Sequence, residues 1–429
     1  MNLFINNILW INPEDQESGK QLSFRIQNGC ISEFGNDIQA YENEEFIDGS
    51  GYCCSPGWID LICRNGAPGR PQNESMETLA EASAAGGFTK IMLQPDTRPV
   101  IDTIESVAYF KNYNSINGVK FLVSGAATQK LEGTKMAEML RMNKEGASSF
   151  SMVQSIADSG FFGRLLQYIQ HSEKVLIDQP SDCFLSKNGQ IHEGIVSDRR
   201  GLTGIPDEAE LLVVERDITM LRYAGGKLHL SCLSVSDSLS KIAEAKKAGL
   251  EISCSIAANQ LAFNHEALDQ FNTVHKVWPP YRTEENRQLL VSALQSGIID
   301  AVVSNHTPWH FDFKDIEFGN AEFGISSLET TFCNLVQFGK ITDPGLIVQL
   351  LYTGPSNILG RETEKLRLGM AADFTLFSTQ GNTDFQKDNW QSKSKNNPFI
   401  GHKLAGRILG IVTEKGFSGY LDRISKNEI

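Results

Sequence analysis

The chain has 429 residues, of which 41% are hydrophobic, and it carries a formal net charge of −13. This length accommodates one large domain and a small accessory one, and the apolar share is ordinary for a globular protein. The acidic balance excludes nucleic acid and anionic membrane surfaces as main partners, because both select clustered Lys and Arg. No apolar run approaches the roughly 20 residues that span a bilayer, and no basic-then-apolar segment opens the chain. The eight cysteines form no CxxC pair, so we expect reduced thiols in a cytoplasmic protein.

The two ends of the chain are predicted to form one small β domain. Short apolar runs separated by turn signals predict an antiparallel sheet, with strands at residues 3–9, 22–26, 30–34 and 45–47. Near the other end, a turn leading into a strand is predicted over 368–377 and a further strand over 407–413. We therefore expect residues 1–54 and 366–429 to build a β-sandwich-like domain that flanks the middle of the chain.

Between these ends, strand-like and helix-like segments alternate. The strands are predicted at 90–93, 121–124, 174–177, 227–233, 251–256 and 301–304, and the helices at 75–85, 237–248 and 284–294. Repeated strand–helix units over roughly 300 residues indicate a parallel sheet, and at this size they favour an α/β fold of the (β/α)8 TIM-barrel type over residues 55–365. An open doubly wound sheet is the alternative. The polar stretch 382–397 is predicted to be a mobile loop.

One segment at the start of the barrel resembles a known family. Residues 56–69 read Pro-Gly-Trp-Ile-Asp-Leu-Ile-Cys-Arg-Asn-Gly-Ala-Pro-Gly. This is similar to the metal-binding strand end of dihydroorotases, Pro-Gly-Phe-Ile-Asp-x-His-x-His-x-Arg-x-Pro-Gly, in the cyclic-amidohydrolase branch of the amidohydrolase superfamily. Matching blocks at 84–89, 95–102, 193–194, 201–206, 276–282 and 323–330 extend the resemblance over nearly the whole chain. It implies a zinc-dependent site at the carboxyl ends of the barrel strands.

The positions that the resemblance assigns to the metal carry other residues. Where the family has histidines, a metal-bridging acid and a proton-shuttling aspartate, this chain has Ile62, Arg64, Met152, Gln179, Cys232 and Asn305. Isoleucine has no lone pair, a guanidinium is permanently cationic, and asparagine cannot ionise. We therefore predict that these positions are degenerate, that no catalytic residue remains, and that the protein holds neither a metal nor another cofactor.

Substrate recognition is altered in the same way. The family arginine and asparagine that hold the substrate carboxylate fall at Gly66 and Asp96, and a further asparagine falls at Trp278. An acid at Asp96 would repel a substrate carboxylate, with no cation at Gly66 to offset it. Together with His306, these residues are expected to line a remnant of the substrate pocket.

Arg64 needs a counter-ion if it points into the barrel mouth, because an unpaired buried charge is costly. The candidate partners are Asp60, Asp96 and Asp178. Such an ion pair would stand where the family holds zinc. Binding of a ligand is the competing use for this arginine.

A replacement metal site is an alternative near a second group of residues. His229, Cys232 and Asp60 could in principle bind one zinc ion. The favoured interpretation is that His229 and Cys232 are buried core residues, since cysteine is among the most buried residue types.

Three functions are compatible with these observations. The first is a non-catalytic dihydroorotase homologue of pyrimidine biosynthesis; the resemblance implies that such a chain, expected as a homodimer, is a structural or regulatory subunit for aspartate carbamoyltransferase. The second is a divergent cyclic amidohydrolase with a relocated or absent metal. The third is a sensor of pyrimidine intermediates.

Overall fold

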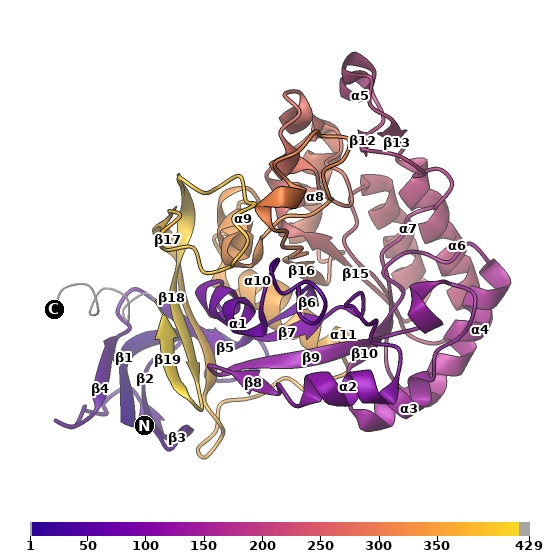
Figure 1. Cartoon of the computed structure of the whole chain (residues 1–429). Helices are drawn as coiled ribbons and strands as arrows, with labels where there is room; N and C mark the ends of the chain where they lie inside the picture. Colours follow the sequence, from indigo (N-terminus) through magenta and orange to yellow (C-terminus); the bar gives the residue numbers. More distant parts are fainter. Residues whose placement is uncertain (1, 420–429) are drawn as a thin grey trace.

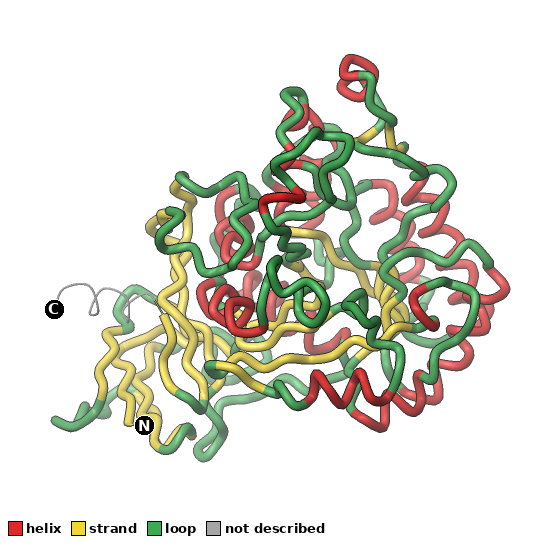
Figure 2. Tube along the Cα trace, in the orientation of Figure 1, coloured by secondary structure: helices red, strands yellow, loops and turns green. Residues whose placement is uncertain are grey.

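The computed structural model describes residues 2–419, which form a helix-wrapped barrel joined to a β-sheet built from both ends of the chain (Figures 1 and 2). The barrel contains eight parallel strands: β6 (Trp58–Cys63), β7 (Phe88–Leu93), β9 (Val119–Ala126), β10 (Ser149–Ser151), β11 (Leu176–Asp178), β14 (Leu228–Leu230), β15 (Ile252–Ala257) and β16 (Ala301–Val303). They pair in this order. A bridge between Cys63 and His306 then joins the end of β6 to the residues after β16. The predicted TIM barrel is confirmed, and the open sheet is not formed.

Helices cover the outside of the barrel (Figure 2). Every residue of β6 and β7 is buried, as expected for parallel strands with packing on both faces. Serine and threonine caps define several helix starts; Ser75, for example, forms a capping box with Thr78 at the first helix. The helices are α1 (Met76–Ala85), α2 (Ile104–Lys111), α3 (Met139–Glu145), α4 (Ser159–Ile169), α6 (Glu208–Ala224), α7 (Ser236–Lys247), α8 (Glu284–Gln295), α9 (Thr331–Gln337), α10 (Pro344–Val348) and α11 (Gly354–Ile358).

The barrel has two small additional elements. β8 (Ser115–Ile116) pairs antiparallel with β9. The segment after β11 forms a projection with the two-stranded ladder β12 (Ile191–His192) and β13 (Gly204–Ile205) and the helix α5 (Ile195–Arg200), at the top of Figure 1.

The second sheet draws its strands from both chain ends, as predicted. Its strands are β1 (Asn2–Trp10), β2 (Gln21–Gln27), β3 (Cys30–Gly35), β4 (Glu45–Asp48), β5 (Cys53–Pro56), β17 (Asp373–Phe385), β18 (His402–Thr413) and β19 (Gly416–Gly419). Their order is β19-β18-β17-β5-β1-β2-β3, with β4 on β1. The expectation of a purely antiparallel sheet is wrong, because β1 pairs in parallel with both β4 and β5. The antiparallel neighbour of β5 is instead β17, from the far end of the chain.

The sheet has an apolar core of its own and a firm junction with the barrel. Trp10 meets Phe374 edge to face, with ring centroids 5.5 Å apart, so strands from the two chain ends share one core. At the junction, Lys90 of β7 forms a buried ion pair with Asp373 of β17. Trp58, fully buried at the start of β6, contacts Phe377 of the sheet, with the two rings tilted by 58° and their centroids 5.1 Å apart.

The polar stretch 382–397 is not the mobile loop that its composition suggests. β17 continues to Phe385, and the following residues pack against the barrel through satisfied hydrogen bonds. Lys393 N donates to Glu74 at 3.0 Å and Ser392 N to Glu329 at 2.9 Å. Polar segments are buried at little cost when their hydrogen bonds are met in this way, and these partners lie too far along the chain for a composition rule to find them.

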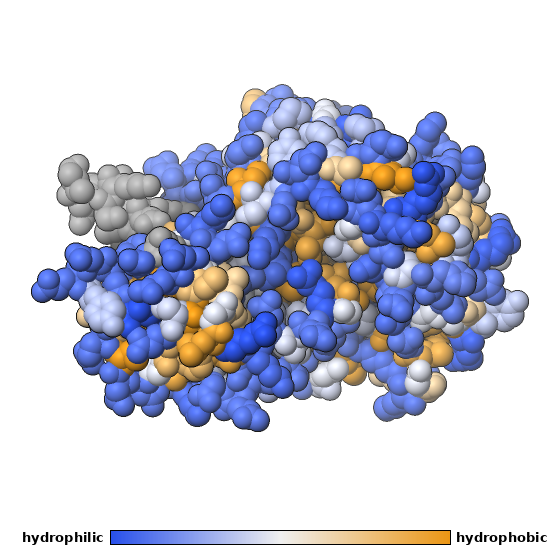
Figure 3. Space-filling view, turned by 90° about the horizontal axis from the view of Figure 1, so that it is seen from below, coloured by the Kyte–Doolittle hydropathy of each residue, from blue (hydrophilic) through white to orange (hydrophobic). Residues whose placement is uncertain are grey.

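The outer surface is mostly polar, with separate apolar patches, in the face that Figure 3 shows. Over residues 2–419, none of the helices has both the length and the apolar character that crossing a membrane requires.

Candidate functional site

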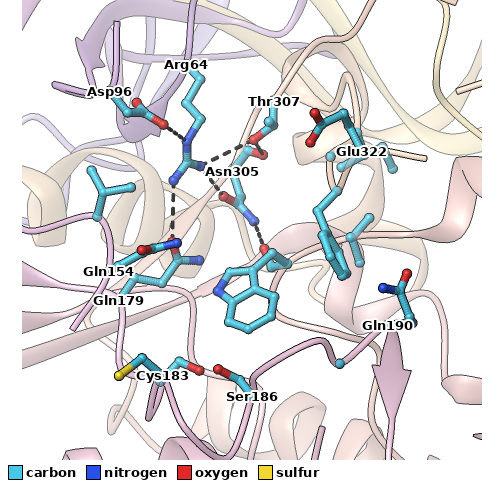
Figure 4. Close-up of a pocket in the computed structure, with 18 of the residues that line it drawn as sticks. Arg64, Asp96, Gln154, Gln179, Cys183, Ser186, Gln190, Asn305, Thr307 and Glu322 are labelled. Atoms are coloured by element: carbon cyan, nitrogen blue, oxygen red, sulfur yellow. Dashed lines mark hydrogen bonds and ion pairs between the residues drawn. The ribbon is translucent and has the colours of Figure 1, made fainter. Parts of the chain in front are cut away.

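A cavity of about 620 Å³ lies at the carboxyl ends of the barrel strands (Figure 4). This is the end of a TIM barrel where sites are built, and the volume suits a small molecule. Polar side chains line it from several strand ends, and Trp278 and Phe323 add apolar walls. The polar lining includes Arg64, Asp96, Gln154, Gln179, Gln190, Asn305 and Thr307.

Arg64 is the centre of the polar network in this cavity (Figure 4). Its Nε donates to Asp96 Oδ2 at 2.7 Å, and its Nη1 donates to Asn305 Oδ1 at 3.2 Å. Nη1 also contacts Thr307 Oγ1 at 3.3 Å, and Nη2 contacts Gln179 Oε1 at 3.5 Å. The arginine therefore points into the barrel mouth and pairs with Asp96, one of the predicted counter-ions. It also brings together the side chains of three positions that were predicted to be degenerate, 64, 179 and 305.

The guanidinium of Arg64 is protonated at neutral pH. Burial by itself lowers the pKa of the guanidinium, but the charge and hydrogen bond of Asp96 outweigh this and raise it. With side-chain exposures of 18% and 29%, Arg64 and Asp96 form a partly enclosed ion pair.

The other two candidate counter-ions, Asp60 and Asp178, do not pair with Arg64, because serine residues bind their carboxylates. Asp60 accepts hydrogen bonds from Ser304 N at 2.8 Å and Ser304 Oγ at 2.5 Å. Burial raises the pKa of Asp60 to about 7, although these bonds act against the shift. Asp178 accepts from Ser155 Oγ at 2.8 Å and lies 3.9 Å from Arg216, behind the cavity wall.

The other three positions that were predicted to be degenerate belong to the apolar core. Ile62, Met152 and Cys232 are at most 2% exposed and pack in the main hydrophobic cluster. Burial raises the pKa of the Cys232 thiol to about 12, against a smaller opposing effect of Arg64. The thiol therefore stays protonated at neutral pH, and the thiolate that a metal needs is disfavoured.

The alternative metal site near His229 does not fit its surroundings either. Both ring nitrogens of His229 contact serine hydroxyls, Ser253 and Ser255, each at 2.9 Å. Burial lowers the pKa of His229 to about 3, so the ring is neutral. Across the described part of the chain, no three His, Cys, Asp or Glu side chains gather in a way that could hold a metal ion. The zinc that the family implies therefore does not fit these residues, and the fixed cation at Arg64 opposes it.

Three of the expected pocket remnants lie near Arg64, and one of them, Asp96, is its ion-pair partner. Trp278 lines the cavity, its carbonyl accepts from Asn305 Nδ2 at 2.8 Å, and its ring meets Phe323 edge to face. Gly66 lies instead in a small hollow beside the cavity. A Cβ there would be 2.1 Å from the carbonyl oxygen of Arg70, so the turn that follows closes tightly over this glycine.

His306 is not part of the cavity, which corrects the prediction. The side chain is fully buried below the barrel mouth. Its Nδ1 accepts from Ser327 N at 3.1 Å, and its Nε2 lies 3.5 Å from Glu74 Oε2. The main chain of His306 closes the barrel, because its carbonyl accepts from Arg64 N at 2.8 Å. The residue therefore supports the site from beneath.

Sequence reasoning missed several polar residues that line the cavity. Gln154 follows β10, and Ser181, Lys187 and Gln190 come from the loop after β11. No periodicity marks residues in loops. Only their position along the chain could have identified these residues. Each lies within a few residues of the end of a barrel strand, or in the long segment that follows a strand.

The backbone is held in an uncommon conformation at three of these strand ends. Val153, Cys232 and Asn305 have φ angles of 60°, 56° and 51°. Asparagine tolerates this left-handed region, but each of the other two costs roughly 1–2 kcal/mol. Such strain is retained where the surrounding structure fixes the side-chain direction.

Comparison with known proteins agrees with this architecture. The family model described as dihydro-orotase-like matches residues 51–238. A dihydroorotase of Geobacter metallireducens is 32% identical over 411 residues, covering 95% of this chain and 96% of that protein. A dihydroorotase-like protein of Pseudomonas aeruginosa is 32% identical over 389 residues, covering 89% and 91%. The L-hydantoinase of Arthrobacter aurescens has the same fold, with a TM-score of 0.83 at 20% identity over 98% of this chain and 97% of that one. On this evidence of sequence, the chain belongs to the dihydroorotase family.

Proposed function

We propose that this protein is a non-catalytic member of its family, one that has exchanged the zinc ligands for an internal ion pair. The observation that carries the proposal is the position of Arg64, whose guanidinium binds Asp96, Gln179 and Asn305 at the barrel mouth. A divalent cation at this place would meet a permanent positive charge and, in Asp96, a carboxylate that is already paired with that charge.

Hydrolysis of a cyclic amide also needs a group that takes a proton. At the position of the family's proton shuttle, Asn305 donates to the Trp278 carbonyl and accepts from Arg64. An amide with both of its ends engaged cannot act as a base. This position therefore supports a role in binding and argues against the family's proton transfer through residue 305.

Metal content and turnover test the proposal together. Purified full-length protein, expressed with zinc in the medium, is expected to hold far less than one zinc per chain and to hydrolyse neither dihydroorotate nor hydantoin above background. The active control is a dihydroorotase of the same family, handled in parallel. Stoichiometric zinc, or turnover that a chelator abolishes, would refute the proposal.

We further propose that the chain is a homodimeric structural or regulatory subunit for aspartate carbamoyltransferase. The support is the family resemblance together with a cavity whose residues favour no reaction. In this role the outer surface meets the partner, so the variant Gln179→Ala inside the cavity is expected to co-purify with the transferase as well as the native chain does. If tagged protein from its native cells brings down no carbamoyltransferase and leaves that enzyme's size and activity unchanged, this role is excluded.

One observation favours a second candidate, a divergent cyclic amidohydrolase or a sensor of pyrimidine intermediates. The cavity of about 620 Å³ is retained and richly polar. A ligand that binds the folded state raises its stability by mass action. Thermal-shift screening with dihydroorotate, orotate and carbamoyl aspartate separates the candidates: a shift without turnover indicates a sensor, and turnover indicates an enzyme.

A further inference from the structure

A second hollow of about 70 Å³ adjoins the cavity on the other side of the Arg64–Asp96 pair. Its lining contains three arginines, Arg64, Arg70 and Arg98, and one acid, Asp96. This local excess of positive charge contrasts with a chain whose formal charge is −13.

Two loops place these arginines together. In the turn after β6, Arg70 N donates to Gly66 O at 2.6 Å, and the Arg70 guanidinium lies 4.9 Å from the ring centroid of Trp309. Arg98 follows Asp96 after β7. Gly69 allows the loops to touch, because its φ is +101° and a Cβ there would lie 2.5 Å from Arg98 Cβ.

Arg70 is half-buried, and Arg98 is exposed beside it. Over residues 2–419, neither guanidinium donates a hydrogen bond to a protein acceptor or forms an ion pair. Arg64 is different, because Asp96 already balances its charge. Two arginines therefore line one hollow, and neither has an ion-pair partner in the described part of the chain.

We propose that this hollow binds one oxyanion group, a carboxylate or a phosphate, of a small metabolite. Planar guanidinium forks match such groups through paired hydrogen bonds. Its volume of about 70 Å³ holds roughly five water-sized spheres, which matches the five heavy atoms of one phosphate group. It shares Arg64, Asp96, Thr307 and Trp309 with the larger cavity, which takes the rest of the ligand.

Arg70 and Arg98 also change the charge expected around Asp96. From the sequence, Asp96 stands without a cation at Gly66 to offset it. In the structure, Arg70 and Arg98 come from outside the family's motif positions and restore positive charge beside Asp96. The proposal does not depend on the chain joining a larger assembly, nor on its lack of turnover.

Calorimetric titration of the full-length protein tests it, with inorganic phosphate and malonate as probes at constant ionic strength and chloride as the reference anion. The native protein is expected to bind one probe molecule per chain. The double variant Arg70→Gln/Arg98→Gln is expected to bind about tenfold or more weakly, as expected when charge-assisted bonds are lost. Arg222→Gln, which removes an exposed arginine of α6, serves as the matched control and keeps native affinity.

The probes distinguish the ligand classes. Binding of phosphate alone indicates a phosphorylated metabolite, binding of malonate alone indicates a carboxylate, and binding of both indicates a general oxyanion site. A second measurement needs no variant: phosphate is expected to protect Arg70 and Arg98, but not Arg222, from phenylglyoxal, as read by mass spectrometry. If neither probe binds the native protein, or if the double variant binds as tightly, the site does not exist.

Discussion

Replacing Arg64 by methionine tests whether the internal ion pair has become a structural element of the barrel mouth. At the separation of 2.7 Å between Arg64 Nε and Asp96 Oδ2, two unit charges attract by about 6 kcal/mol at an effective dielectric constant near 20. Desolvation of both groups offsets most of this attraction. Exposed pairs contribute about 0–1 kcal/mol, and breaking buried ones costs about 3–5 kcal/mol. With exposures of 18% and 29%, this pair lies between those cases, so we expect a coupling energy of about 2 kcal/mol.

A double-mutant cycle measures that coupling directly. The variants are Arg64→Met, Asp96→Asn and their combination, and urea unfolding followed by circular dichroism and tryptophan fluorescence gives the free energy of unfolding of each. Arg64→Lys is expected to retain part of the coupling, because an ammonium keeps the charge and loses the fork. Arg222→Met controls for the loss of a surface arginine. A coupling energy below about 0.5 kcal/mol would show that Arg64 is not anchored in the barrel, and the reasoning about its replacement of zinc would fail with it.

Three further predictions concern the surroundings of the site. Burial raises the pKa of Asp60 to about 7. Between roughly pH 4 and 7 the folded chain therefore keeps a proton that the unfolded chain releases. The free energy of unfolding is expected to fall as the pH rises through that window. Asp60→Asn is expected to flatten this dependence in urea midpoints measured at about pH 5 and 8; an unchanged slope would contradict it. Val153→Gly relieves a φ of 60° and is expected to raise the free energy of unfolding by about 0.5–1 kcal/mol, whereas Asn28→Gly at 52° changes it less. Glu74→Ala removes the buried acceptor of Lys393 N. It is expected to lower the free energy of unfolding by about 3 kcal/mol and to expose residues 386–401 to protease. Glu77→Ala on the exposed face of α1 is the control, and equal effects of the two variants would refute the anchoring role of Glu74.

Much of this architecture could be predicted because it depends on local pattern and on family resemblance. The barrel strands, the helices at 75–85 and 284–294, and the partner of Arg64 follow from strand ends and from the cost of an unpaired charge. The errors have a common cause, which is contact between distant segments. Glu74 meets Lys393 across 319 positions, and nothing in the composition of the 382–397 stretch reveals that anchor. The prediction for His306 failed because its neighbour Asn305 faces the cavity, while the left-handed turn at that residue directs the next side chain inward.

The arrangement of the second sheet has a consequence for how the protein is made. β5 lies between β1 and β17, and the junction bond from Trp58 N to Thr375 Oγ1 spans 317 positions. At roughly 5–20 residues per second, a ribosome needs on the order of 15–60 s to supply the missing strand. During that interval β5 presents an open edge, the kind of surface that pairs with other nascent chains. Biogenesis of this protein is therefore expected to depend on a chaperone that shields the amino-terminal strands until synthesis is complete.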